Sequence, residues 1–142
     1  MIFQVRLHAG CMSLSGDRVK RTTLSRTTCL DLLRGADFAR VVISVRCLPA
    51  ALPARIDVID DHQLILASTE EAVIVAARRG DVLSVQIDGL ESDGATWSVM
   101  ASGIAAPAQG HVTQSPPLQL ALGNGASLIL LPLAVVVGER VG

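Results

Sequence analysis

The chain has 142 residues, of which 50% are hydrophobic, 18% charged and 2% aromatic, and its formal net charge at pH 7 is −1. This length suits one compact domain and is too short for two domains with separate cores. The apolar share is well above that of a disordered chain, so the sequence predicts a folded domain. A charge this close to zero argues against a large basic face, and we expect no nucleic-acid partner.

The cysteines are widely spaced and form no CxxC pair, which is typical of a reduced protein. They are Cys11, Cys29 and Cys47. The chain begins without the apolar run of a signal peptide, and its longest apolar stretch, 128–137, is about half of a membrane span. We therefore predict a cytoplasmic location without membrane contact. His62 and His111 lack metal-ligand spacing, so we predict no metal site.

Residues 1–23 show no hydrophobic period and are predicted to form a mobile arm, followed by one domain over residues 24–142. Order begins at Ser25, a residue type that caps helices. The helix that follows is predicted to end at Gly35.

Three extended segments come next. Residues 38–45 form a β-branched run, and residues 47–58 carry two prolines, which place that segment at a sheet edge or a bulge. A turn at 59–61 leads to a third strand over 62–68. Together they predict a meander.

The second predicted helix spans residues 69–80. Thr69 is the expected cap, acidic residues occupy the first turn, arginines occupy the last turn, and Gly80 lies just past the end. Each of these charges complements the helix dipole.

The remaining chain predicts strands at 81–88 and 96–106 joined by a polar loop at 89–94, then a connection over 107–125 and a final strand at 128–137. Two helices are too few to cover a parallel sheet. The sequence therefore predicts a mainly β protein, a six-stranded antiparallel barrel with an N-terminal helix and a short helix between strands three and four.

Several local strings spanning residues 24–140 carry a resemblance. They are Leu24-Ser25 through Leu33, the strand 40–45, Leu52-Pro53, Arg79-Gly80-Asp81-Val82, Trp97-Ser98-Val99 with Gly103, and the closing 135–140. In this order and spacing they resemble the pyridoxamine 5'-phosphate oxidase-like family, the flavin-binding split barrels. The resemblance implies a split β-barrel, a homodimer, and FMN held at the subunit interface.

The resemblance also implies which residues meet the cofactor. The matching positions are Ser68 and Thr69 for the phosphate, Ala54, Arg55 and Ile56 for backbone contacts to the flavin ring, and Trp97 and Ser98 at the ring edge. Trp97 can instead simply fill the dimer interface.

At the phosphate position the chain departs from the family. The family's Arg is replaced by Ala67, and its Ser-Lys pair falls on Ala72 and Val73. Glu70 and Glu71 put two carboxylates where a dianionic phosphate would sit. One such pair of like charges at about 4 Å costs about 4 kcal/mol at an effective dielectric constant of about 20.

Arg55 is one candidate for the missing positive charge. Asp57 follows two positions later on the same face of the strand, and an ordinary surface pair between Arg55 and Asp57 is the favoured alternative.

Two classes of function follow. The first is an FMN-dependent oxidoreductase in which the flavin carries the hydride and no protein acid or base is obligatory. The alternative is a flavin-free split-barrel dimer that acts as a binding or structural module, or a relative that uses deazaflavin or haem. The apolar strands leave apolar faces for a second copy, which favours a homodimer in either case. The substrate is not defined by the sequence.

Overall fold

The computed structural model describes residues 19–108 and 115–142. In chain order these residues form β1 (Arg21–Thr23), α2 (Arg26–Arg34), β2 (Phe38–Val45), β3 (Leu48–Asp60), β4 (Gln63–Ser68), α3 (Glu71–Arg79), β5 (Val82–Leu90), β6 (Thr96–Ile104), β7 (Ala106–Pro107), α4 (Pro116–Gly123), β8 (Ser127–Pro132) and β9 (Val135–Val141). The rest of the predicted arm, residues 1–18, lies outside the described residues, as do Cys11 and His111.

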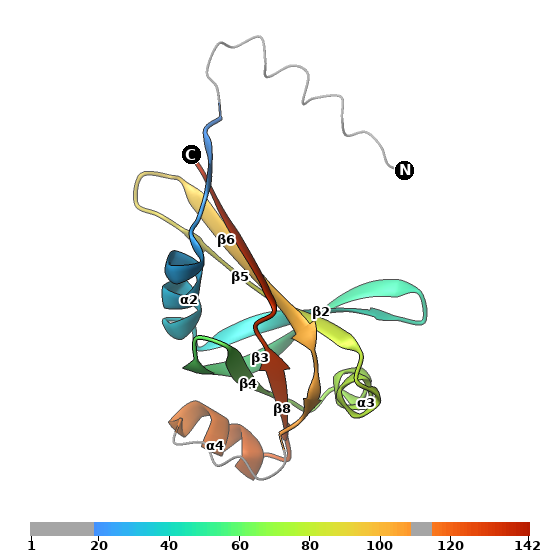
Figure 1. Cartoon of the computed structure of the whole chain (residues 1–142). Helices are drawn as coiled ribbons and strands as arrows, with labels where there is room; N and C mark the ends of the chain where they lie inside the picture. The colour runs from blue at the N-terminus through green and yellow to red at the C-terminus, as the bar shows by residue number, and fades with distance from the viewer. Residues whose placement is uncertain (1–18, 109–114) are drawn as a thin grey trace.

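All strands of the described residues belong to one antiparallel sheet in the order β1-β9-β6-β5-β2-β3-β4-β8-β7. Figure 1 shows that this sheet is strongly twisted and curled, so that β8 passes close to β6 although they are not neighbours in the sheet. The prediction of a mainly β, antiparallel protein is confirmed. The predicted count is wrong, because the described residues contain nine strands rather than six and three helices rather than two.

α2 forms where the sequence predicts it. The Ser25 hydroxyl accepts a hydrogen bond from the Thr28 N–H at 3.1 Å, and the helix ends at Gly35. Cys29, Leu30 and Leu33 form its buried face. Helix and sheet pack closely, since a Cβ added at Gly138 of β9 would lie 2.5 Å from the Cys29 sulfur. Burial raises the pKa of the Cys29 thiol.

α3 ends at Gly80 as predicted, with a φ of 73° that favours glycine. The expected cap at Thr69 is wrong, because Glu70 occupies the capping position and no side chain caps the helix. Thr69 and Glu70 connect the end of β4 to the first residue of α3. The Ser68 hydroxyl supports this connection by accepting a hydrogen bond from the Glu70 N–H at 3.0 Å.

Other predicted boundaries also shift. The turn between β3 and β4 falls at residues 61–62 rather than 59–61, and β5 continues to Leu90 because Gly89 and Leu90 pair with β6. The predicted connection 107–125 contains α4. The predicted final strand is two strands, since the chain bends at residues 133–134 and passes from a pairing with β4 to a pairing with β6. β1, in the predicted arm, pairs with β9.

A two-residue turn joins β2 to β3, and its residues adopt left-handed backbone angles. Arg46 has a φ of 53° and Cys47 a φ of 65°. This is the backbone geometry of tight hairpins that glycine and asparagine normally supply. The hairpin projects from the sheet in Figure 1.

The main core lies between the sheet, α2 and α3, with β-strand residues such as Val41, Leu64 and Val85 fully buried. A second, smaller cluster lies under α4 and consists of Ile65, Ala67 and Leu118. Among the described residues, no helix is both long enough and apolar enough to span a membrane.

Candidate functional site

A pocket of about 410 Å³ lies between β3, β4 and α4, and we call it the β3–β4–α4 pocket. It contains four of the seven predicted cofactor-binding residues, namely Ala54, Arg55, Ser68 and Thr69. Phe38 and Pro53 also line it from the sheet, and Leu120, Ala121 and Asn124 line it from the helix side.

Arg55 supplies the positive charge of this pocket. It lies directly opposite Ala67 in the β3–β4 ladder, and its side chain is exposed. No carboxylate of the described residues lies within 4 Å of its guanidinium. The predicted Arg55–Asp57 pair is therefore wrong. Residues two apart on a strand lie about 7 Å apart, and Arg55 lines the pocket whereas Asp57 does not.

Ser68 also lines this pocket, and its side chain is buried. Its exposure is only 3%, and its oxygen accepts the Glu70 N–H. Within the described part of the chain, the hydroxyl proton of Ser68 has no acceptor. A buried donor without an acceptor is costly unless something else accepts its proton. The neighbouring Thr69 adds a second, exposed hydroxyl.

Glu70 and Glu71, which the sequence places against a phosphate, do not line this pocket. Val73, where the family has a basic residue, is fully buried in the core, and a charged side chain there would have no solvent. The pocket therefore has one cation, Arg55, and no carboxylate among its lining residues.

Ile56 does not line the β3–β4–α4 pocket. Its side chain belongs to the core with 3% exposure, and its N–H donates to the Asp37 carbonyl oxygen at 3.3 Å. The backbone N–H of Ile56 is thus already bonded within the chain.

Trp97 and Ser98 lie outside the β3–β4–α4 pocket. They are neighbours on β6, so their side chains point to opposite faces of the sheet. Trp97 packs against the main core and lines an opening of about 520 Å³ between β2 and β5, the β2–β5 opening. Ser98 is exposed on the other face, beside Asp88 and Glu139 in the register. Within one chain the predicted site is therefore divided.

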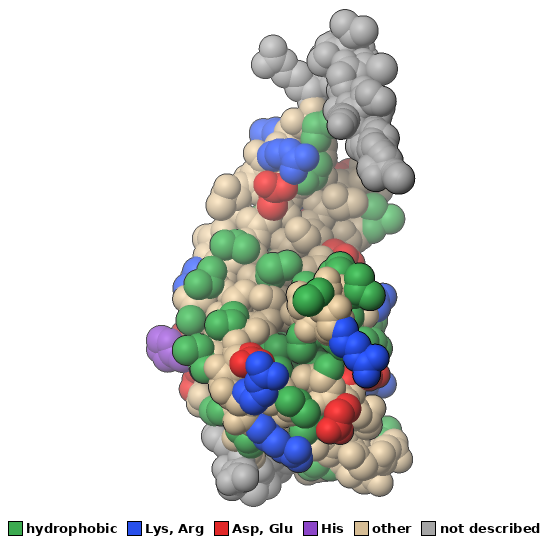
Figure 2. Space-filling view, turned by 90° about the vertical axis from the view of Figure 1, so that its right-hand side faces the viewer, with side chains coloured by type: hydrophobic (Ala, Val, Ile, Leu, Met, Phe, Trp, Pro, Cys, Tyr) green, Lys and Arg blue, Asp and Glu red, His purple; other side chains and the backbone are tan. Residues whose placement is uncertain are grey.

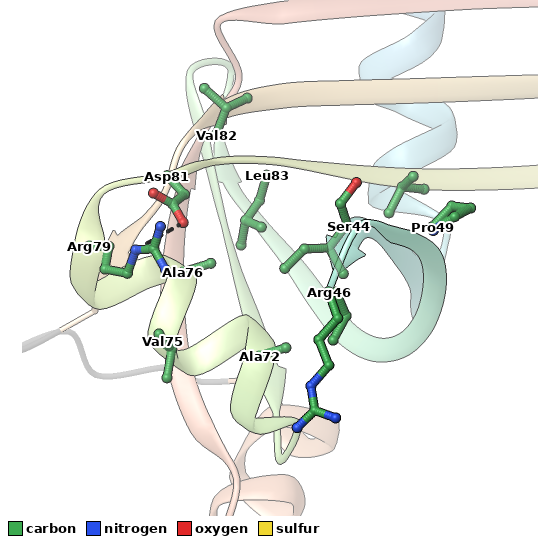
Figure 3. A pocket seen from close by; sticks show the side chains of 13 residues that line it. Ser44, Arg46, Pro49, Ala72, Val75, Ala76, Arg79, Asp81, Val82 and Leu83 are labelled. Carbon is green, nitrogen blue, oxygen red and sulfur yellow. Dashed lines mark ion pairs between the residues drawn. The ribbon is translucent and has the colours of Figure 1, made fainter.

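Figure 3 shows a pocket of about 630 Å³ between α3 and the β2–β3 hairpin. It contains none of the predicted site residues. Arg79 and Asp81 form an ion pair at one end, with 3.4 Å between Nε and Oδ2, and Arg46 extends from the hairpin beside the turn that carries Ala72. Most of the remaining lining is aliphatic.

The sequence analysis missed Phe38 and the whole α4 wall. A signal for α4 was present, because Pro116 and Pro117 occupy the first helical positions, where proline is favoured. Leu118 and Leu122 follow with helical spacing. Among the described residues, no three His, Cys, Asp or Glu side chains come together as metal ligands.

The sheet order and the helix between β4 and β5 define a mainly antiparallel β protein with a curled sheet. A family model described as pyridoxamine 5'-phosphate oxidase matches residues 25–115, which is more than half of the chain. The chain therefore belongs to the pyridoxamine 5'-phosphate oxidase-like family. No curated protein matches it in sequence.

Solved structures share the fold. An FAD-binding protein from Mesorhizobium loti has a TM-score of 0.67 and 16% identity over 88% of this chain and 99% of its own. The FAD-binding protein from Mycobacterium smegmatis has a TM-score of 0.61 and 20% identity over 85% and 98%. An FAD- and haem-binding protein from the same species has a TM-score of 0.59 and 14% identity over 84% and 72%.

Proposed function

We propose that this chain is a flavin-binding protein of its family, with FMN as the cofactor and the β3–β4–α4 pocket as the place of the phosphate. The observation that carries the proposal is an uncompensated guanidinium, Arg55, in a pocket that Ser68 and Thr69 also line and that no carboxylate lines. Structural neighbours described as FAD-binding proteins support a flavin in this fold.

The donor set fits a phosphate. Arginine forms charge-assisted hydrogen bonds to phosphate oxygens, often two at once, and the exposed Thr69 in the same lining adds a hydroxyl donor. Arg55 would thereby replace the basic residues that the family carries at the positions of Ala67 and Val73. Bound flavin supplies hydride transfer, and the protein's part is to orient the flavin and to exclude water.

A homodimer would complete the site, and we propose one. The face of β9, β6, β5 and β2 that points away from the main core, the outer face, exposes several apolar side chains. These are Val137 and Met100 in one row of cross-strand neighbours, which also holds Gln86, and Val135 and Val42 in the next row, which also holds Ser102 and Ser84. Figure 2, from the side of the hairpin, shows apolar side chains spread across the middle of the molecule. Ser98 lies on the outer face, so a second copy seated there could present Ser98 to the partner's flavin.

The absorption spectrum of the purified protein is the first test of the cofactor. We expect a flavin band near 450 nm or, after titration with FMN, binding at micromolar concentration; a Soret band would point to haem instead. In Arg55→Gln we expect FMN affinity to fall about 10- to 100-fold, since a hydrogen bond to a charged group contributes about 1.5–3 kcal/mol. Arg46→Gln is the matched control, because Arg46 is an unpaired arginine outside the pocket.

A colourless protein that binds no flavin at millimolar concentration would reject the proposal and leave the flavin-free module. Sedimentation tests the dimer: Val137→Glu on the outer face should give monomers, whereas Ile59→Glu, an exposed apolar residue on β3 and outside those four strands, should not. The unpaired, exposed thiol of Cys47 supports a cytoplasmic location, which is part of the proposal.

A further inference from the structure

The pocket of Figure 3 exists because the pairing of β2 with β5 stops before the strands end on that side. Their ladder ends at Val42↔Ser84, although β2 continues to Val45 and β5 already begins at Val82. The two strands separate toward the β2–β3 hairpin, and α3 lies across the gap on the core side of the sheet. We call the resulting space of about 630 Å³ the α3–hairpin pocket.

The core side of this pocket is aliphatic. Ala72 and Ala76, one helical turn apart, face the gap from α3, and Leu83 points toward the helix from β5 (Figure 3). Ile43 also lines the pocket, and by strand alternation it lies on the same side of β2 as the buried Val41. The sheet and the helix thus present apolar side chains to each other across the gap.

Arg46 brings an unpaired positive charge to one end of the core side. Figure 3 shows its guanidinium beside the turn of α3 that carries Ala72. Within the described part of the chain it forms no ion pair. Ser44 and Val82 line the pocket as well, but in Figure 3 they point to the opposite side of the sheet and so lie away from this charge.

The other charges of the lining cancel. Arg79 and Asp81, at the far end of α3, form an ion pair with 3.4 Å between Nε and Oδ2. Glu70 and Glu71 lie at the start of α3, but neither lines the pocket, and among residues 19–108 and 115–142 neither pairs with Arg46. Two arginines and one aspartate leave the lining with a formal charge of +1.

The backbone at Arg46 is an unusual place for an arginine. Its φ of 53° is left-handed, and such angles are more costly for arginine than for glycine or asparagine. Those two residue types are the usual choice in two-residue hairpin turns. Strained backbone of this kind is concentrated at functional sites, where another interaction compensates for it. The position of Arg46 is therefore a second reason, besides its charge, to assign it a ligand.

We propose that the α3–hairpin pocket binds a small aliphatic carboxylate, with its carboxylate on Arg46 and its chain along α3 toward Arg79. A guanidinium forms charge-assisted and often bidentate hydrogen bonds to a carboxylate. From Ala72 to Arg79 the helix rises about 10 Å, which accommodates a chain of about eight carbons. The pocket also has the usual composition of a small-molecule site, a mostly apolar lining with few polar groups that orient the ligand.

This site is separate from the proposed flavin site. The α3–hairpin pocket and the β3–β4–α4 pocket have no lining residue in common. Arg46 lies in the turn of the β2–β3 hairpin, whereas Arg55 pairs with Phe38 at the other end of the same ladder. The inference therefore goes beyond the proposed function and does not rest on it, and variants of one arginine at a time test the two sites separately.

Calorimetric titration of the full-length protein with octanoate, below the concentration at which micelles form, is the direct test. 1-Octanol and octylammonium carry the same chain without the negative charge, and acetate carries the charge without the chain. We expect octanoate to bind at least about tenfold more tightly than each of them, because a hydrogen bond to a charged group and the burial of several methylene groups each contribute at least that much.

Variants of Arg46 test the carboxylate contact. Arg46→Gln should weaken octanoate binding about tenfold or more, and so should Arg46→Asn. Asparagine adopts left-handed angles more readily than arginine, so Arg46→Asn should melt at the same temperature as the parent or higher. Lost binding in that variant is then not lost folding. Arg55→Gln, the same chemical change in the other pocket, should leave octanoate binding unchanged.

Ala72→Leu tests the aliphatic part of the site. Leucine is a good helix former, and its side chain would occupy the space that the ligand chain needs. We expect octanoate binding to weaken at least about tenfold. Ala121→Leu, the same substitution on α4 in the lining of the β3–β4–α4 pocket, is the matched control and should bind octanoate as the parent does.

The inference is overturned if octanol, octylammonium or acetate binds as tightly as octanoate, or if Arg46→Gln or Ala72→Leu binds octanoate as the parent does. Loss of octanoate binding in Arg55→Gln would also overturn it, because the ligand would then lie in the β3–β4–α4 pocket. If FMN binds and octanoate does not, this inference fails alone. If octanoate binds in an Arg46-dependent way and FMN does not bind, only the proposed function fails.

Discussion

α2 and α4 both lie against the sheet, but they are held there in different ways. α2 has a capped start, three buried side chains, and Arg26, whose guanidinium donates to the carbonyl oxygens of Asp61 at 2.9 Å and Leu133 at 3.0 Å. α4 has no charged residue in its first or last turn and buries only Leu118. The comparison indicates that α2 has a structural role. α4 is held by one buried side chain, Leu118, and other residues of this helix line the β3–β4–α4 pocket.

The largest expected effect comes from truncating one buried leucine on each helix. Leu33→Ala on α2 and Leu118→Ala on α4 remove the same atoms from side chains that are 1% and 0% exposed. We expect a loss of about 2–5 kcal/mol in the free energy of unfolding, with Leu33→Ala the more damaging because it opens the main core. Urea denaturation measures this.

FMN titration of the same two variants separates the roles of the helices. Leu118→Ala should weaken FMN binding because α4 lines the pocket, and Leu33→Ala should leave the affinity of the folded protein unchanged. Equal FMN affinities in both variants would contradict the assignment of α4 as a wall of the site.

Two glycines sharpen the contrast in packing. Gly138→Ala would place a methyl group 2.5 Å from the Cys29 sulfur and 3.3 Å from Leu24, and we expect a loss of about 1–3 kcal/mol. Gly123→Ala at the end of α4 meets no atom within 4 Å. It should be neutral or slightly stabilising. A thermal melt of both variants shows whether α2 is the more closely packed helix.

A smaller effect is expected at the start of α2. Ser25→Ala removes the oxygen that accepts the Thr28 N–H, and the loss of such a cap costs about 1 kcal/mol. Thr28→Ala keeps that acceptor and is the matched control. Equal stability of Ser25→Ala and the parent in urea would show that packing alone holds α2.

The smallest effect lies away from both helices, at the β5–β6 turn. The Ala95 N–H, and to a lesser degree Arg140, lower the pKa of Asp93. Because the folded pKa is depressed, this stabilisation is present above the unfolded pKa and is lost as the pH falls through the folded pKa. The stability of the parent should therefore decline more steeply below about pH 4 than that of Asp93→Asn. Denaturation at several pH values tests this, and identical slopes would contradict it.

Elements with strong local signals could be predicted from the sequence. β2 matches its predicted range, and α2 and α3 end at the predicted glycines. α4 could not be found in the same way, because it has no charged ends and follows residues rich in loop-forming types. The split of the last strand depends on a tertiary contact, the hydrogen bond from the Leu133 N–H to the His62 carbonyl oxygen.

The candidate site was predicted in part. Proximity of Ala54, Arg55, Ser68 and Thr69 follows from the β3–β4 pairing that a meander implies. The absence of an ion pair between Arg55 and Asp57 could not be inferred from the sequence, since strand alternation alone puts Asp57 on the same face. The α3–hairpin pocket was also hidden, because it depends on where a ladder ends and not on any motif.

The turn at Arg46 and Cys47 bears on the order of folding. Both residues adopt left-handed angles that cost a non-glycine residue about 1–2 kcal/mol each, so this turn does not favour its own closure. The register of β2 against β3 is instead fixed by eight consecutive cross-strand pairs, from Phe38↔Arg55 to Val45↔Leu48. We therefore expect strand pairing rather than the turn to drive formation of this hairpin, so that the turn closes late.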